Sequence, residues 1–140
     1  MTGASSGLGD ALAREYASRG ALLGLAARRK ELLERLADEL PGQPQIYPLD
    51  VRDALALRQA AADFISRFGP PDVVIGNAGT SIGTLTAHAG DLPVFEEIFA
   101  INMLGLVNTF QPFLSAMRER RSGSLVGMAS VAGFRGLPGA

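Results

Sequence analysis

Short apolar runs alternate with amphipathic stretches along this chain, and that alternation limits the folds it can adopt. An apolar run bounded by glycine, proline or charge favours a buried strand, whereas apolar side chains recurring every three to four residues favour a helix. Strands are predicted at Ala21 to Ala27, Ile46 to Leu49, Asp72 to Gly76 and Ser124 to Ser130. Helices are predicted over residues 8–20, 32–40 and 57–68, and from Asp91 to about Met117 with a kink or restart at Pro112. The pattern predicts an α/β fold, a doubly wound parallel sheet with helices on both faces.

Composition sets further limits. With 140 residues, 47% of them hydrophobic, the chain can bury one core, and one domain is predicted over residues 1–140. The longest apolar run, Ala21 to Ala27, is too short for a membrane span of about 20 residues. A balance of 13 basic and 14 acidic side chains supplies no basic stripe for nucleic acid. Zero cysteines and one histidine argue against disulfides and metal sites, and a cytoplasmic protein is expected.

A glycine-rich loop at the amino end is the first candidate binding element. Gly3, Gly7 and Gly9 stand at i, i+4 and i+6, with the hydroxyls of Ser5 and Ser6 at the start of a predicted helix. Bare backbone and unpaired helix N–H groups favour a bound pyrophosphate. The alternative is an ordinary tight turn in which one of the serines caps the helix.

Polar residues also follow the other predicted strands. In parallel sheets, ligands bind beyond the carboxyl ends of the strands, so these residues should converge with the glycine loop. They are Arg28, Arg29, Asp50, the Asn77-Ala78-Gly79 segment and Ser130.

Five motifs follow one another along the chain: Thr-Gly-x-x-x-Gly-x-Gly at residues 2–9, Asp50-Val51, Asn77-Ala78-Gly79, Asn102 and Ser130-Val131-Ala132-Gly133. Together they resemble the short-chain dehydrogenase/reductase family. The resemblance covers essentially the whole chain and implies a Rossmann-like, nicotinamide-dependent oxidoreductase that transfers hydride between cofactor and a small carbonyl or alcohol substrate. It also implies a homo-oligomer when the protein is complete.

The resemblance assigns roles residue by residue. The residues that would surround the cofactor phosphates and ribose are Gly3, Ser5, Ser6, Gly7, Leu8 and Gly9. Asp50 would accept from the adenine amino group beside the Val51 backbone, and Asn77, Ala78 and Gly79 would line the adenosine side. Ser130 would bind the substrate oxygen, and Asn102 would hold a helix kink and a proton-relay water. Taken alone, the last two are equally well a strand-end hydroxyl and a helix-interior amide.

The choice of dinucleotide follows from charge. An acidic residue closing the second strand would bind the ribose 2′-hydroxyl of NAD, but that strand ends in Ala27. Arg28 and Arg29 come next, and guanidinium groups grip phosphate, so NADP is predicted. The alternative is that both arginines are solvated residues at a helix start.

Two family features are missing. The catalytic Tyr-x-x-x-Lys pair cannot form, because Lys30 is the only lysine and lies four positions after neither tyrosine. Only Met1 and Thr2 precede Gly3, so the central first strand of a 3-2-1-4-5 sheet is expected to be absent, leaving its two neighbours without a shared partner. The chain is therefore interpreted as an incomplete Rossmann-like domain, truncated at both ends, and a poorly folded one.

Three functional hypotheses stay open. The first is an NADP(H)-dependent short-chain oxidoreductase of which this chain keeps the cofactor half. The second is a non-catalytic nucleotide-binding or interaction protein that retains the cleft without a proton donor. The third is an inert fragment, which undetectable cofactor binding would favour.

Overall fold

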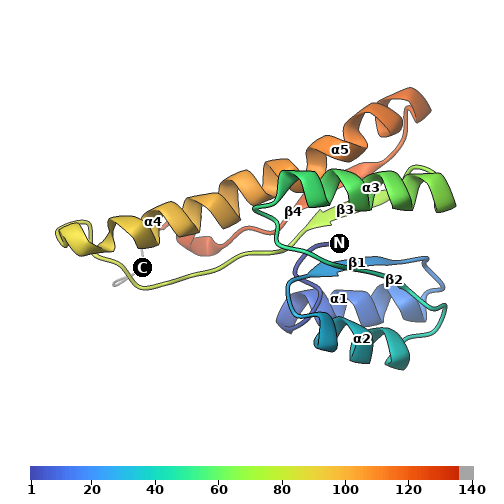
Figure 1. The fold of residues 1–140 in the computed structure, drawn as a ribbon, viewed down its shortest axis with the longest axis horizontal. Coiled ribbons are helices and arrows are strands. Elements are labelled where there is room, and N and C mark those ends of the chain that lie inside the picture. The colour runs from blue at the N-terminus through green and yellow to red at the C-terminus, as the bar shows by residue number, and fades with distance from the viewer. Residues whose placement is uncertain (136–140) are drawn as a thin grey trace.

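The computed structural model describes residues 1–135 and contains four strands and five α-helices within that range. The strands are β1 (Gly24–Ala27), β2 (Gln45–Pro48), β3 (Val73–Gly76) and β4 (Ser124–Gly127). The helices are α1 (Gly7–Ser18), α2 (Lys30–Glu39), α3 (Ala54–Phe68), α4 (Leu92–Phe99) and α5 (Gly105–Arg120). Helices α1 and α2 lie on one side of the strands, and α3 and α5 lie on the other (Figure 1). This is the predicted α/β arrangement, although the predicted domain's last five residues lie outside the described part.

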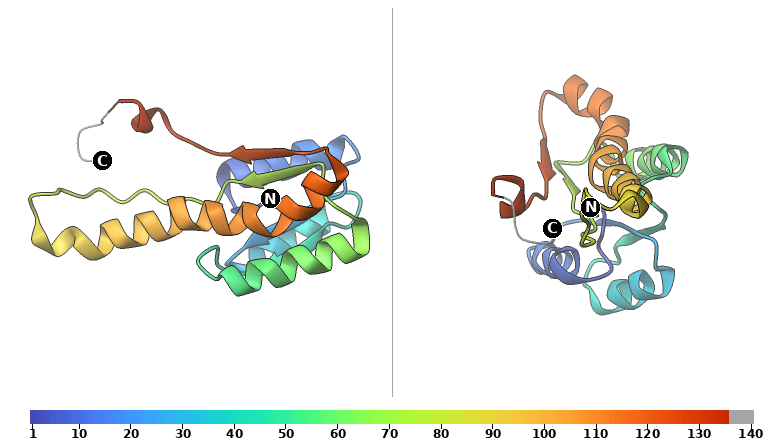
Figure 2. Two further views of the ribbon diagram at one scale, coloured as in Figure 1. Left: turned by 90° about the horizontal axis from the view of Figure 1, so that it is seen from above. Right: turned by 90° about the vertical axis from the view of Figure 1, so that its left-hand side faces the viewer.

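All strand pairs in the described chain are parallel. Gly24 of β1 pairs with Gln45 of β2, and Val73 of β3 pairs with Ser124 of β4. The structure thus contains two small sheets, β1-β2 and β3-β4, instead of one continuous sheet. Figure 2 shows both sheets between the helices, with α4 extending beyond them at one end.

Met1 and Thr2 join the two sheets. The Ala26 N–H donates to the Met1 carbonyl at 2.9 Å, and Thr2 forms a parallel bridge with Ala26. On the other side, the Thr2 N–H donates to the Ile75 carbonyl at 2.9 Å. The spatial order is therefore β2-β1-(1–2)-β3-β4. The expectation that β1 and β3 share no neighbour is wrong at their carboxyl ends and correct along the rest of their length.

Several predicted boundaries change. β1 begins at Gly24 instead of Ala21, because the Ala21 N–H donates to the Tyr16 carbonyl in the turn that closes α1. β4 ends at Gly127, which leaves Ser130 in the following loop. The helix does not restart at Pro112, which lies within α5. Its irregular segment comes earlier, as a π-helical turn at Ala100–Leu104.

The largest core cluster lies between β1 and its covering helices. Leu25 and Leu33 are fully buried there. Helix α1 reaches this core through Ala13 and Ala17, and small side chains of this kind let a helix approach a sheet closely. Leu8 is 65% exposed, so it does not belong to the core-facing face of α1.

The long helical run from 89 to 120 is the one segment of the described chain whose length and composition would allow it to cross a membrane. Only 17% of its most apolar window is buried. Such a run is weak evidence for a membrane span, because core helices of soluble proteins have the same properties. Here α5 packs against α3 and β3.

The buried Met1 amine predicts a pH-dependent stability. Burial lowers the pKa of this ammonium from 8.0 to about 6, while its N–H donates to the Gly24 carbonyl at 2.6 Å. The unfolded chain then holds the proton more tightly than the folded chain, so the free energy of unfolding should rise from pH 6 to pH 8 and be lost as the pH falls. A pKa difference of about two corresponds to about 2.7 kcal/mol.

Urea unfolding at pH 6 and pH 8 measures this change. The matched control is the same chain with an acetylated amino terminus, which keeps an N–H but carries no titratable amine. Its free energy of unfolding should not show this rise between pH 6 and pH 8. An equal rise for the two chains would contradict the prediction.

Candidate functional site

A cavity of about 370 Å³ lies at the carboxyl ends of β1, β2 and β3. It is lined by Gly3, Ser5, Ser6, Leu8, Ala27, Arg28, Arg29, Leu49, Asp50, Val51, Asn77, Ala78, Gly79, Thr80 and Ile101. Most of the predicted cofactor-binding residues therefore come together as expected. Gly7 and Gly9 do not line the cavity, and neither do the two predicted catalytic residues, Asn102 and Ser130.

Each glycine of the loop has its own structural reason. Gly3 has a φ of +67°, and a side chain there would meet Ala78 and Asn77 at 2.8 Å. Gly9 is buried, and a side chain there would overlap the Gly3 carbonyl oxygen. Gly7 has a φ of +57° with no atom near its missing side chain. Gly3 and Gly9 thus allow close packing, whereas Gly7 leaves bare, accessible backbone at the first position of α1.

The loop is a turn, but the serine hydroxyls do not cap the helix, so the capping role that the tight-turn alternative gave them is wrong. Ser6 is the N-cap of α1, but its side chain makes no capping bond. Instead, Arg29 Nη2 donates to Ser5 Oγ at 3.1 Å and to Ser6 Oγ at 2.8 Å. The first N–H groups of α1 have no partner within the helix, which leaves donors available for an anion.

Positive charge collects at the end of β1. Arg28 and Arg29 are exposed and line the cavity immediately after Ala27. Arg29 is directed at the glycine loop by its bonds to the two serines. Because no carboxylate closes β1, this rim favours a phosphate over an uncharged hydroxyl.

Asp50 is held by a residue that the sequence reasoning missed. Arg52 Nη2 lies 2.6 Å from Asp50 Oδ2, and the Arg52 backbone N–H donates to Asp50 Oδ1 at 2.9 Å. Hydrogen bonding from Arg52 lowers the pKa of Asp50, and the charge of Arg28 adds to the effect. The Asp-x-Arg spacing is the only sequence signal for this pair. Asp50 is therefore an oriented, ionised acceptor at the end of β2.

Thr2 is the second residue that was missed. It is 3% exposed, and its hydroxyl accepts from the backbone N–H of Asn77 at 3.2 Å and of Ala78 at 3.3 Å. The Asn77 amide returns the contact, donating to the carbonyls of Thr2 at 3.3 Å and Gly3 at 3.2 Å. Asn77 lines the cavity, and its side chain fixes the glycine loop to the end of β3.

The side chains of Asn102 and Ser130 both bond to backbone groups of the chain. Asn102 lies in the π-helical turn, where its Oδ1 accepts from the Thr80 N–H and its Nδ2 donates to the Thr80 carbonyl, both at 2.8 Å. Ser130 is exposed, and its hydroxyl accepts from the Ala132 N–H at 3.1 Å. The structure does not bring these two side chains together with the cavity. Asn102 instead positions the segment after β3, whose Thr80 does line it.

The groups of this site fit an extended ligand that carries negatively charged phosphate groups. The cavity lining offers two serine hydroxyls and two guanidinium groups, with one carboxylate farther along at Asp50. The N-terminus of α1 follows directly after Ser6. No cluster of three or more metal-ligating side chains occurs within residues 1–135.

Comparisons with known proteins agree with this geometry. Residues 1–140 match the family model described as short chain dehydrogenase. An NADP-dependent 3-hydroxy acid dehydrogenase of Shigella flexneri is 32% identical over 95% of this chain and 54% of its own length. Dehydrogenase/reductase SDR family member 7B of Mus musculus is 36% identical over 99% of this chain and 45% of its own length. The chain spans about half the length of these curated relatives.

Among solved structures, an alcohol dehydrogenase from the archaeon Thermococcus sibiricus, complexed with 5-hydroxy-NADP, superimposes with a TM-score of 0.91. It is 31% identical, and the match covers 99% of this chain and 60% of the archaeal one. The match therefore spans about three fifths of that structure.

The close approach at Gly9 predicts a specific sensitivity. Gly9→Ala should destabilise the chain by about 2 kcal/mol or more, because the new methyl group overlaps the Gly3 carbonyl and lies 2.7 Å from Asn77 Nδ2. The control is Gly90→Ala, where no atom lies near the added group. Urea midpoints for the two variants measure the difference, and comparable losses would show that the glycine loop does not need this contact.

Proposed function

The chain belongs to the short-chain dehydrogenase family, and on that premise we propose that its cavity binds NADP(H) within an oxidoreductase acting on a small carbonyl or alcohol substrate. We further propose that residues 1–140 act as part of one dinucleotide-binding domain. The cofactor assignment is supported by the NADP dependence of the bacterial relative and by the 5-hydroxy-NADP bound in the archaeal structure.

One observation carries the cofactor proposal. Arg28 and Arg29 stand at the cavity rim, in the place where an NAD-binding site of this kind has an acid that accepts from the ribose 2′-hydroxyl. A carboxylate there would repel a 2′-phosphate, whereas guanidinium groups bind it through charge-assisted hydrogen bonds. Arg29, already bonded to Ser5 and Ser6, is held in place for that contact.

The remaining residues would bind the rest of the cofactor. The Gly3–Gly9 loop and the start of α1 would hold the diphosphate, with Leu8 beside it. The Asp50 carboxylate would accept from the adenine amino group, next to the Val51 backbone, and Ala78 and Gly79 would line the adenosine. When bound, NADP(H) supplies or accepts the hydride.

The substrate-side residues remain proposals. We assign Asn102 a positioning role, because its amide is already committed to both backbone groups of Thr80. Ser130 would donate its hydroxyl hydrogen to the substrate oxygen, because a hydroxyl that accepts from the Ala132 N–H still has its own hydrogen to donate.

The second candidate is a non-catalytic nucleotide-binding protein. Such a protein would lack a Tyr-x-x-x-Lys pair, and these 140 residues contain none, since Tyr16 and Tyr47 are followed four positions later by Gly20 and Val51. A lysine lowers the pKa of a nearby phenol, so this chain holds no such proton donor. NADPH binding without NADPH oxidation in the presence of carbonyl compounds is the outcome expected of these 140 residues, and turnover would exclude the second candidate.

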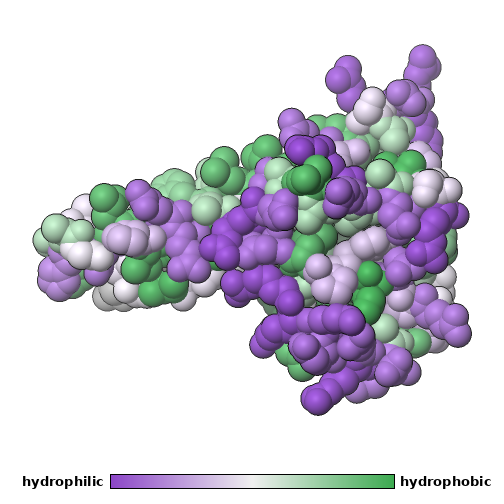
Figure 3. Space-filling view, viewed as in Figure 1, coloured by the Kyte–Doolittle hydropathy of each residue, from purple (hydrophilic) through white to green (hydrophobic). Residues whose placement is uncertain are grey.

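The proposed partners follow from charge and exposure. The balance of 13 basic and 14 acidic side chains supports a small-molecule substrate over nucleic acid, and the lack of cysteines supports a reducing compartment such as the cytoplasm. No membrane partner is proposed. Apolar side chains on the α4–α5 run are more than half exposed, among them Leu92, Phe99 and Met103, and green surface marks this region in Figure 3. We propose that this face contacts a second copy in the complete protein.

Reversing the rim charge tests the cofactor assignment. Arg28→Glu should weaken NADPH binding at least tenfold, about 1.4 kcal/mol, because a carboxylate replaces a phosphate-binding cation. NADH binding should stay the same or tighten, since the new carboxylate can accept from the 2′-hydroxyl. Titration calorimetry with both nucleotides measures the two dissociation constants.

Arg58→Glu is the matched control, because it makes the same charge change on an exposed part of α3 outside the cavity. It should leave the NADPH preference unchanged. An Arg28→Glu chain that keeps the preference would refute the rim assignment, and a folded chain that binds neither nucleotide would refute the function.

A further inference from the structure

Both oxygens of the Asp50 carboxylate are bound by the same residue, Arg52. The Arg52 backbone N–H donates to Asp50 Oδ1 at 2.9 Å, and Arg52 Nη2 donates to Asp50 Oδ2 at 2.6 Å. Arg52 Nε lies between the two oxygens, 3.1 Å from Oδ1 and 3.0 Å from Oδ2. A single bond to Oδ1 leaves a carboxylate free to turn, whereas the guanidinium contacts to Oδ2 fix its plane.

Arg52 holds this carboxylate from outside the cofactor cavity. Asp50 lines the cavity, and Arg52 does not. A carboxylate offers about four acceptor positions, and the backbone, Nε and Nη2 hydrogens of Arg52 occupy all but one of them. The acceptor position that is left therefore belongs to the side of Asp50 that faces the cavity.

The backbone around Asp50 is fixed by bonds that do not involve the Arg52 guanidinium. The Leu49 N–H donates to the last residue of β1 at 3.0 Å, and the Asn108 amide donates to the Val51 carbonyl at 3.0 Å. Val51 itself is 8% exposed. Removing the guanidinium should therefore release the carboxylate of Asp50 without moving its backbone.

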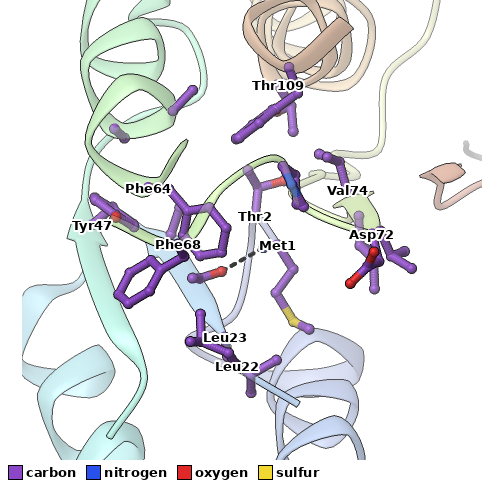
Figure 4. A pocket seen from close by; sticks show the side chains of 18 of the residues that line it. Met1, Thr2, Leu22, Leu23, Tyr47, Phe64, Phe68, Asp72, Val74 and Thr109 are labelled. Carbon is purple, nitrogen blue, oxygen red and sulfur yellow. Dashed lines mark hydrogen bonds between the residues drawn. The ribbon is translucent and has the colours of Figure 1, made fainter. Parts of the chain in front are cut away.

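Asp72 shows that contact with an arginine is not enough to orient a carboxylate. It lies at the second cavity, of about 310 Å³, between β1 and β3 (Figure 4). Arg120 Nη1 lies 3.1 Å from Asp72 Oδ1, but the same guanidinium donates to the carbonyls of Pro70 and Pro71. The Asp72 side chain is 91% exposed, whereas that of Asp50 is 25% exposed. The hold on both oxygens is what distinguishes Asp50.

We propose that Arg52 is a positioning residue for the base of the cofactor: by fixing the Asp50 carboxylate, it leaves one directed acceptor that selects a 6-aminopurine. This inference rests on the proposed NADP(H) function and deepens it. Adenine donates a hydrogen of its 6-amino group to that acceptor. Hypoxanthine carries an oxygen at the same position, so it has no hydrogen to donate there and leaves the carboxylate unpaired.

The test compares NADPH with its deamino analogue, reduced nicotinamide hypoxanthine dinucleotide phosphate, by titration calorimetry on the 140-residue chain. The unaltered chain should bind NADPH about tenfold or more tightly than the analogue, because a hydrogen bond to a charged group is lost. In Arg52→Leu this preference should fall to about threefold or less, because the released carboxylate has to be ordered on binding. The preference of this variant for NADPH over NADH should stay, since Arg28 and Arg29 are unchanged.

Arg58→Leu is the matched control, because it makes the same replacement on an exposed part of α3 outside the cavity. It should keep both preferences. The thermal midpoint of Arg52→Leu should stay close to that of the unaltered chain, since exposed ion pairs contribute little to stability. Arg52→Gln, which removes the charged fork but keeps a polar side chain, should show the same loss of base preference and replaces Arg52→Leu if that variant does not fold.

A double variant tests whether Arg52 acts through Asp50. Asp50→Asn should itself lose the preference, because an amide can donate to the oxygen of hypoxanthine as well as accept from adenine. Adding Arg52→Leu to Asp50→Asn should then change nothing further. An additional effect of the second substitution would show that Arg52 acts by another route, which overturns the inference.

The remaining outcomes separate this inference from the cofactor proposal. Equal binding of NADPH and the deamino analogue by the unaltered chain overturns the inference and leaves the NADP(H) proposal in place. An Arg52→Leu chain that keeps the full base preference overturns it in the same way. A folded, unaltered chain that binds neither nucleotide overturns the proposed function, and the inference with it.

Discussion

The contacts of Thr2 hold this structure together. Its neighbours Met1 and Ala4 bond to Ala26 of β1, and its own N–H donates to Ile75 of β3. The Thr2 hydroxyl accepts from two N–H groups at the end of β3. No other backbone pairing joins the two sheets within the described residues. The position of the glycine loop, and with it the shape of the cofactor cavity, depends on these contacts and on the bonds from the Asn77 amide to the carbonyls of Thr2 and Gly3.

The two cavities are consequences of the same arrangement. Where Met1 and Thr2 pair with both strands, the sheet is continuous, and polar groups gather beyond its carboxyl edge. Upstream of Met1 the strands have no shared partner, and an apolar gap remains between them. The cofactor proposal rests on the charges at the first location.

The site shows how side chains with family roles can also be structural. Asn77 holds the glycine loop, Asn102 holds Thr80, and Arg52 holds Asp50, each through hydrogen bonds that exist without ligand. Preorganised groups of this kind lower the cost of ordering a site when a ligand binds. Substituting them should therefore affect affinity through the shape of the cavity.

The sequence alone determined the order of strands and helices and the convergence of Gly3, Arg28 and Asp50, because hydrophobic periodicity fixes element type and parallel strands bring their carboxyl ends together. It could not reveal the burial of Thr2, the Asp50–Arg52 pair or the exposure of Leu8, since these depend on which neighbours meet across the sheet. It also placed Ser130 in a strand and near the site, whereas its hydroxyl makes a local contact in a loop. Periodicity shows only which face of an element is apolar. Hydrogen bonds such as that between Thr2 and Asn77, about 75 residues apart, form only in the folded chain, so the tertiary structure alone decided them.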